Sequence, residues 1–331
     1  MKKLACMVVA AILPLAAHAQ TPLQSWHADL SQGYARLAAT SGQLSEALNQ
    51  YCAMPDAAGQ SAVREQWIKA FMAWQAVRFV EFGPIEQDSM GWQMQFWPDK
   101  KNLIARKSQM LLRSEIPVTA ETLANEGVAV KGFPALEYLL FEHEAKSGPG
   151  SACPLSSVIG NQLEANAETL AQNWQQFQTH FESRDTYTAD MVKSAIHATE
   201  IIRDKRLGEP MGLHGSNRRL HFLADAWRSE QSLATVQASL EGLNDYFMPG
   251  LEQVLKGSAP ELLQETRERL TTALEKARAL PPGMKALLDN DESYAQLQSL
   301  FISIDALVIH LNDRVAVELG IVKGFNSSDG D

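Results

Sequence analysis

The sequence lacks the short motifs by which several classes of enzyme are usually found. It contains no H-E-x-x-H, no glycine-rich phosphate loop, no G-x-S-x-G and no C-x-x-C. It is also poor in positive charge, with 29 Lys and Arg residues against 39 Asp and Glu residues and a net charge of −10. An acidic chain argues against a nucleic-acid partner, which requires a basic surface. The charge is compatible with cation binding or with solubility alone.

Long apolar runs are also scarce, and the one clear run lies at the N-terminus. It extends from Leu4 to Ala17, follows two lysines, and is followed by the small-residue sequence AHA. This arrangement is typical of a signal peptide over residues 1–19 that is cleaved after Ala19. Cys6 lies at the start of the run instead of following it, which argues against a lipid anchor. Because no later segment offers about 20 consecutive apolar residues, we expect an exported mature chain without a transmembrane span.

Cysteine is rare as well, with three residues in the whole chain. Cys52 and Cys153 remain after removal of the predicted signal peptide. Exported chains fold in an oxidising environment, where these two cysteines can pair as a disulfide. Such a bond would close a loop of about 100 residues and contribute roughly 4–5 kcal/mol by restricting the unfolded chain. The alternative is two separate buried thiols.

Strand patterns are nearly absent, whereas apolar residues recur at the three- and four-residue spacing of amphipathic helices. The clearest runs are Leu30, Tyr34, Leu37, Leu44, Leu48 and Tyr51; Ile159, Leu163, Leu170, Trp174, Phe177 and Phe181; and Leu297, Leu300, Ile304, Leu307, Leu311 and Val315. Stripes of this length are typical of helical bundles. The sequence therefore predicts an all-α fold.

Segments rich in proline and glycine divide the chain, and EAKSGPGSACPLS (144–156) is the strongest candidate for a domain boundary. We expect a first bundle over residues 23–146, a second over 155–320, and an irregular tail over 321–331. Each half has room for about four helices, so we expect two related up-down bundles packed side by side. The groove between two such units is a favoured place for a ligand.

A single acid, Glu137, stands inside the apolar segment GFPALEYLLF (132–141). Pro134 suits the first turn of a helix, and the positive end of the helix dipole favours a carboxylate nearby. Because a buried carboxylate without a partner is costly, three interpretations remain open. Glu137 is a structural acid paired with an arginine or with backbone N–H groups, a contact for a metal or ligand, or an exposed acid. We expect Arg78 to pair with it when no ligand is bound.

Arg78 and Glu81 continue the apolar stripe of the segment SAVREQWIKAFMAWQAVRFVEFGP (61–84). They lie three residues apart, so they can meet on one helix face. They either form an ordinary ion pair at the end of the bundle or face a site that they share with Glu137.

Further candidates stand at the ends of other predicted helices. Asp99, in FWPDKKNL (96–103), is either a helix cap or a third carboxylate near Glu137. Arg203 and Lys205 stand where a helix ends, a position that favours cations. The candidate metal ligands are Glu81, Asp99 and Glu137, and the candidate ligand contacts are Arg78, Trp97, Arg203 and Lys205.

From about residue 25 to its C-terminus, the chain resembles the imelysin family, also described as iron-regulated periplasmic proteins. The segments that carry the resemblance are QWIKAFMAWQAVRFVEFGPIE, FWPDKKNL, KGFPALEYLLF and GFNSSDGD. The family motif is G-x-H-x-x-E. Here Gly132 and Glu137 match its Gly and Glu, and Pro134 stands where the motif has His.

The resemblance implies two related helical bundles, a periplasmic location and a link to iron acquisition. It also implies membership of a family once classed as metallopeptidases, with the motif His and Glu as supposed metal ligands. A proline side chain cannot bind a metal, so a zinc site of that kind cannot form here. We therefore expect binding rather than catalysis.

The expected function is a non-catalytic periplasmic protein that binds iron, another cation or a small anionic ligand between its bundles. The carboxylates would supply oxygen ligands for a hard cation, and Arg78 would orient them or contact a ligand anion. Two alternatives stay open. One is a metallopeptidase with a different ligand set, and the other is a scaffold that binds an envelope partner through the aromatic segment MGWQMQFW (90–97).

Overall fold

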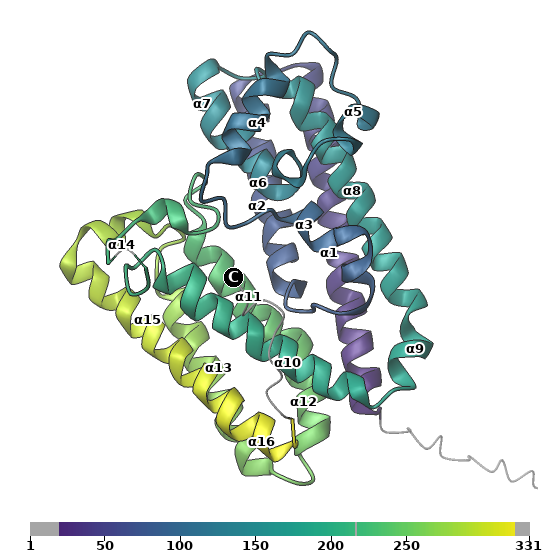
Figure 1. The fold of residues 1–331 in the computed structure, drawn as a ribbon, viewed down its shortest axis with the longest axis vertical. Helices are drawn as coiled ribbons and strands as arrows, with labels where there is room; N and C mark the ends of the chain where they lie inside the picture. The colour runs from purple at the N-terminus through teal and green to yellow at the C-terminus, as the bar shows by residue number, and fades with distance from the viewer. Residues whose placement is uncertain (1–19, 216, 322–331) are drawn as a thin grey trace, which may run out of the picture.

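The computed structural model describes residues 20–215 and 217–321, which contain helices and no β-strand (Figure 1). The predicted all-α fold is therefore confirmed for this part of the chain. The predicted signal peptide (1–19) and residues 322–331 of the predicted tail lie outside the described residues. Between residues 20 and 321, no described helix is long and apolar enough to cross a membrane.

The first bundle is built around α1, a helix of 32 residues. Thr21 fixes its start, because the Thr21 hydroxyl accepts from the Gln24 backbone N–H while the Gln24 side chain accepts from the Thr21 N–H. The predicted apolar stripe of α1 is buried throughout. The helices of this bundle are α1 (Pro22–Ala53), α2 (Ala57–Val77), α3 (Met90–Met94), α4 (Leu103–Leu112), α5 (Ala120–Ala124), α6 (Gly132–Glu137), α7 (Glu144–Ser147), α8 (Cys153–Gln176) and α9 (Gln178–Glu182).

The second bundle holds the remaining α-helices of the described residues. These are α10 (Thr186–Ile201), α11 (Ser232–Gly242), α12 (Met248–Leu255), α13 (Pro260–Arg278), α14 (Lys285–Asp289), α15 (Asp291–His310) and α16 (Ala316–Glu318). Four helices pass directly into π-helical turns, at Tyr138–His143, Ile202–Gly208, Leu243–Phe247 and Leu311–Val315. Short 3-10 turns lie at Gly83–Ser89, Val128–Val130 and His221–Leu223.

The division between the bundles differs from the expected one. Helix α8 packs along α1, and α9 contacts both of them, whereas α10 packs on α15 (Figure 1). The division therefore lies between α9 and α10, and the expected first bundle (23–146) and second bundle (155–320) are corrected. The segment at 144–156 is a turn inside the first bundle, where proline and glycine reverse the chain between α7 and α8 without ending the domain.

A disulfide joins the two long helices of the first bundle. Cys52, near the end of α1, is bonded to Cys153, the first residue of α8, and the two Cα atoms are 5.4 Å apart. The structure thus has the disulfide, and not the alternative of two separate thiols.

The two bundles pack closely through α2 and α11. Gly242, the last residue of α11, lies against the backbone of Ala76 in α2, and a Cβ atom at position 242 would overlap the Ala76 carbonyl oxygen. Nearby, the Trp26 indole of α1 donates to the Phe247 carbonyl oxygen over 2.7 Å. Backbone-to-backbone contact of this kind requires glycine, so the bundles form one packed unit at this point.

Gly242→Ala is expected to lower the free energy of unfolding by about 1–3 kcal/mol, because two backbones must separate to admit the methyl group. Urea unfolding measures the change. Gly127→Ala is the matched control, since a Cβ atom at position 127 has no atom within 4 Å. Equal stabilities of the two variants would show that α2 and α11 do not depend on this close approach.

Candidate functional site

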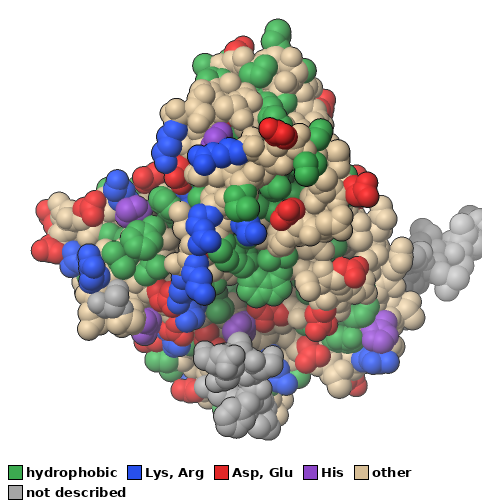
Figure 2. All heavy atoms as spheres, turned by 45° about the horizontal axis from the view of Figure 1, so that its top comes forward, with side chains coloured by type: hydrophobic (Ala, Val, Ile, Leu, Met, Phe, Trp, Pro, Cys, Tyr) green, Lys and Arg blue, Asp and Glu red, His purple; other side chains and the backbone are tan. Residues whose placement is uncertain are grey.

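A cavity of about 340 Å³ lies between the two bundles. Figure 2 shows hydrophobic side chains gathered between the halves, with Lys and Arg side chains alongside. The first bundle contributes Phe71, residues 95–100, Asn102, Ile104, Pro134, Glu137 and Glu142, and the second contributes residues 221–228.

The first wall is the segment that precedes α4. Asp99 accepts from the backbone N–H groups of Leu103 and Ile104, over 2.7 and 2.9 Å. Both carboxylate oxygens therefore hold the start of α4, as the cap interpretation predicts. Trp97 and Asp99 also line the cavity, so this cap orders one of its walls.

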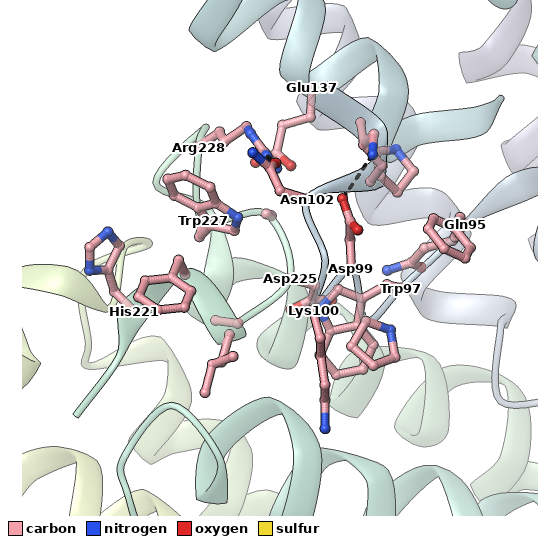
Figure 3. A pocket seen from close by; sticks show the side chains of 18 of the residues that line it. Gln95, Trp97, Asp99, Lys100, Asn102, Glu137, His221, Asp225, Trp227 and Arg228 are labelled. Atoms are coloured by element: carbon pink, nitrogen blue, oxygen red, sulfur yellow. Dashed lines mark hydrogen bonds between the residues drawn. The ribbon is translucent and has the colours of Figure 1, made fainter. Parts of the chain in front are cut away.

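The second wall is the segment 221–228, and Arg228 ties it to the first. Arg228 Nε donates to Glu142 over 2.7 Å and its Nη2 donates to Asn102 over 3.0 Å. Its guanidinium lies 4.4 Å from the ring centroid of Trp227. Figure 3 shows Arg228 and Glu137 together at one end of the cavity, with Trp227 and His221 along one side.

Glu137 is buried, with 3% of its surface exposed, and its partners come from the second bundle. Its Oε1 accepts from both the backbone N–H and the hydroxyl of Ser229, each over 2.9 Å. Burial raises the pKa of Glu137, and the nearby Arg228 and the Ser229 hydrogen bonds oppose that rise, whereas Asp225 adds to it. The expected pairing of Glu137 with Arg78 is therefore wrong.

Gly132 places Glu137 by allowing a close backbone approach. Its φ of +72° lies in the left-handed region, and a Cβ atom there would overlap the carbonyl oxygen of Met94. The start of α6 therefore lies directly against the end of α3. This contact explains the glycine of the motif in structural terms.

Arg78 instead binds Gln95, and Gln95 points into the cavity (Figure 3). The Gln95 Oε1 accepts from Trp74 Nε1, Gln75 Nε2 and Arg78 Nη1, over 2.8, 3.0 and 2.8 Å. Three donors on one oxygen fix the orientation of the amide. The Gln95 Nε2 is buried and has no hydrogen-bond partner among the described residues.

Asp225 and Arg206 form a buried ion pair behind the second wall. Each side chain is 2% exposed, and Arg206 Nη2 lies 3.2 Å from Asp225 Oδ2. The distance suits an ion pair, but the two atoms are not aligned as a hydrogen bond. Asp225 Oδ1 accepts from the Thr235 hydroxyl over 3.0 Å. Burial lowers the pKa of Arg206, and the charge of Asp225 opposes this.

The three predicted metal ligands do not come together. Asp99 and Glu137 line the cavity, whereas Glu81 lines a separate small pocket with Arg78 and lies 3.6 Å from His197. Helix α2 ends at Val77, so Glu81 lies beyond it. Within residues 20–215 and 217–321, no group of three or more His, Cys, Asp or Glu side chains could hold a metal ion. The expected single cluster of acids is corrected.

Two other predicted ligand contacts also lie elsewhere. Arg203 pairs with Asp204 and Asp305, and Lys205 pairs with Glu209. Neither Arg203 nor Lys205 lines the cavity. Their charges are satisfied at the end of α10, as the helix-terminus interpretation predicts.

The residues that sequence reasoning missed are Gln95, Asp225 and Arg228. Gln95 and Asp225 carry one usable signal, because each is a polar residue between apolar neighbours, in the segments MQF and ADA. Nothing local distinguishes Arg228, which acts by bridging segments far apart in the chain.

Glu137 gives the protein a testable pH dependence. Burial raises the pKa of Glu137 in the folded protein above its ordinary value of 4.5. The contribution of Glu137 to stability is therefore complete below pH 4.5 and is lost as the pH rises through the raised pKa. Relative to Glu137→Gln, the wild type should lose about 1.4 kcal/mol for each unit of that rise. Denaturant unfolding between pH 4 and pH 8 measures the difference. The exposed Glu121→Gln is the control, and parallel curves for wild type and Glu137→Gln would contradict the prediction.

Comparison with known proteins gives consistent matches along most of the chain. Residues 30–311 match the family model described as imelysin. Iron-regulated protein A of Synechococcus elongatus is 23% identical over 275 residues, covering 75% of this chain and 72% of that protein.

Two solved structures share the fold. An imelysin-like protein from Psychrobacter arcticum superposes with a TM-score of 0.79 at 22% identity, covering 92% of this chain and 98% of that one. A putative iron-regulated protein A precursor from Parabacteroides distasonis superposes with a TM-score of 0.70 at 10% identity. The match covers 93% of this chain and 97% of that one.

Proposed function

Since this chain belongs to the imelysin family, we propose that it is an exported, non-catalytic binding protein of the periplasm. In this proposal it serves an iron-linked process and holds its ligand in the cavity between the two bundles. The names of two relatives, iron-regulated protein A and a putative precursor of such a protein, support the link to iron and the export. The N-terminal pattern of residues 1–19 supports export independently.

The observation that carries the proposal is the amide nitrogen of Gln95, which has no hydrogen-bond partner within the described part of the chain. A buried donor without a partner costs about 1–3 kcal/mol, and here the orientation of the amide is enforced by three other donors. The nitrogen points into a cavity formed by both bundles. An acceptor on a bound ligand would recover that cost, and the enforced orientation of the amide suits such an acceptor.

Pro134 supports binding over catalysis. It lines the cavity at the motif position where the family has His, and its ring offers no atom to a metal or to a proton in transfer. The residues that remain, Glu137 and Asp99, are engaged by Ser229 and by the start of α4. These groups fit the retention of a ligand better than the activation of water.

Native mass spectrometry tests the proposal. Protein isolated from its own periplasm, or incubated with the low-mass fraction of a periplasmic extract, is expected to carry a small molecule that is lost on denaturation. Gln95→Glu should lose it, since this change keeps an acceptor for the three donors but removes the free N–H. Trp92→Leu is the control, because Trp92 is 53% exposed and does not line the cavity.

A wild-type protein that takes up no small molecule from the extract would refute the binding role. A molecule retained equally by Gln95→Glu would place the site elsewhere. The link to iron is measured separately, as a rise in abundance of the protein during iron-limited growth. An abundance that does not change with iron supply would remove that part of the proposal.

A further inference from the structure

The cavity is built for something larger than a bare ion. Its volume of about 340 Å³ falls at the lower end of the range of about 300–1,000 Å³ for small-molecule sites. A metal ion needs converging side-chain ligands, and the described residues offer no group of three. Among the residues that line the cavity are the aromatic rings of Trp97, Phe222 and Trp227. Such walls suit a flat organic body.

The polar groups that line the cavity require both a hydrogen-bond acceptor and a hydrogen-bond donor on the ligand. Gln95 Nε2 is a fixed donor without a partner in residues 20–215 and 217–321, so it needs an acceptor on the ligand. Glu137 and Asp225 stand in the same lining and are 3% and 2% exposed. Ser229 engages one carboxylate oxygen of Glu137, whereas both oxygens of Asp225 already face protein groups, because Thr235 donates to Oδ1 and Arg206 Nη2 lies 3.2 Å from Oδ2. The Glu137 carboxyl group is therefore the one that an N–H group of a ligand matches best.

The charge of the lining disfavours an anion. Four acidic residues line the cavity against two basic ones. Of the two basic residues, Arg228 is already bound to Glu142, and Lys100 Nζ lies 3.3 Å from Glu209. Aromatic rings beside buried acids attract cationic or N–H-bearing groups. A carboxylate ligand would face repulsion with no free cation to receive it among the described lining residues.

We infer that the ligand is a flat organic molecule, uncharged or cationic, that carries an acceptor for Gln95 Nε2 and an N–H donor for the Glu137 carboxyl group. Carboxamides and amino-substituted heterocycles are the chemical classes that meet these demands. This inference rests on the proposed binding function and names the class of ligand for the same cavity. Iron would reach the site only as part of such an organic molecule.

Three probe molecules of the same shape differ in their hydrogen-bond acceptors, N–H donors and charge, so they test these requirements one at a time. Benzamide offers one acceptor and two N–H donors, benzamidinium offers N–H donors and positive charge, and benzoate offers acceptors and negative charge. Dissociation constants at pH 7 come from ligand-detected NMR titration. Benzamide is expected to bind at least about tenfold more tightly than benzoate, which corresponds to one hydrogen bond and about 1.4 kcal/mol.

Gln95→Glu and Trp92→Leu make the test specific. In Gln95→Glu, benzamide should lose about tenfold or more in affinity while benzamidinium does not, because the N–H that requires an acceptor has become an oxygen. Trp92→Leu should leave all three affinities unchanged. Independently of any variant, intermolecular nuclear Overhauser effects should connect the benzamide ring to the Trp227 indole.

Benzoate binding as tightly as benzamide would overturn the inference. So would a benzamide affinity that Gln95→Glu does not change, or binding of Fe²⁺ alone that displaces benzamide. Failure of all three probes would also overturn it, but the binding role would stand if the periplasmic small molecule is still retained. If no probe binds and no periplasmic small molecule is retained, the proposed function itself is refuted.

Discussion

Asp225→Asn is expected to lower the free energy of unfolding by about 3–5 kcal/mol, the cost of leaving one member of a buried ion pair without its partner. The asparagine keeps the size of Asp225 and an oxygen that can accept from Thr235, so the change removes little besides the charge. Arg206, which is 2% exposed, then has no compensating charge beside it. Urea unfolding at neutral pH measures the loss.

Two further variants isolate the cause. Adding Arg206→Met to Asp225→Asn should recover most of the stability, because an uncharged pair of similar volume needs no compensation. Asp291→Asn breaks the exposed pair with Arg219, where Asp291 is 92% exposed, and should have little effect. If Asp225→Asn and Asp291→Asn behave alike, the charge of Arg206 does not depend on Asp225.

Removal of the disulfide is the second change with a large expected effect. Cys52 and Cys153 are separated by 101 positions, and a loop of that length corresponds to about 4.7 kcal/mol of stabilisation through the unfolded chain. The double variant Cys52→Ala/Cys153→Ala should lose about that amount or somewhat less. Equilibrium unfolding of the oxidised wild type and of the variant gives the difference.

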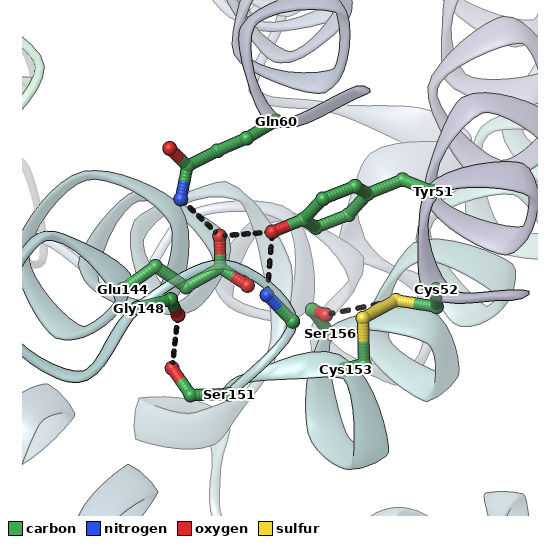
Figure 4. Close-up of a disulfide and its surroundings, with 9 residues drawn as sticks. Tyr51, Cys52, Gln60, Glu144, Gly148, Ser151, Cys153 and Ser156 are labelled. Atoms are coloured by element: carbon green, nitrogen blue, oxygen red, sulfur yellow. Dashed lines mark hydrogen bonds between the residues drawn. A yellow bond between two sulfur atoms is a disulfide. The ribbon is translucent and has the colours of Figure 1, made fainter. Parts of the chain in front are cut away.

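Hydrogen bonds beside the disulfide continue to join α1 to the turn before α8 when the disulfide is removed. Tyr51 donates to Glu144 over 2.9 Å and accepts from the Gly150 N–H, and Gln60 also donates to Glu144 (Figure 4). These contacts hold the turn before α8 against α1 without the disulfide, so we expect a weakened but folded protein. A reducing agent should shift the wild type to the stability of the variant and leave the variant unchanged. A reducing agent without effect on the wild type would contradict this account.

Local sequence patterns predicted the helices well and the partners of polar side chains poorly. The stripe of α1 and the stripe from Leu297 to Val315 are buried as their spacing predicts. The division between the bundles was missed because proline and glycine mark any sharp turn. The packing of α8 along α1 depends on contacts between residues more than 100 positions apart.

The site shows the same limit. Burial of Glu137 was one of the interpretations that its apolar neighbours allowed, but its partner Ser229 lies 92 positions away and is supplied by the other bundle. Arg78 was expected to meet Glu137 because it continued the stripe of its helix. It meets Gln95 instead, from a segment 17 positions later. Periodicity identifies which face a residue occupies, and it carries no information on which other segment covers that face.

The most direct test of the account is a crystal structure of the protein isolated from its own source cells and incubated with the low-mass fraction of an extract of those cells. The account predicts electron density for a flat organic molecule between the two bundles, with an acceptor atom within hydrogen-bond distance of Gln95 Nε2 and an N–H group facing Glu137. Ligand density confined to the separate pocket of Arg78 and Glu81, or a bare metal ion bound anywhere in place of an organic ligand, would contradict it.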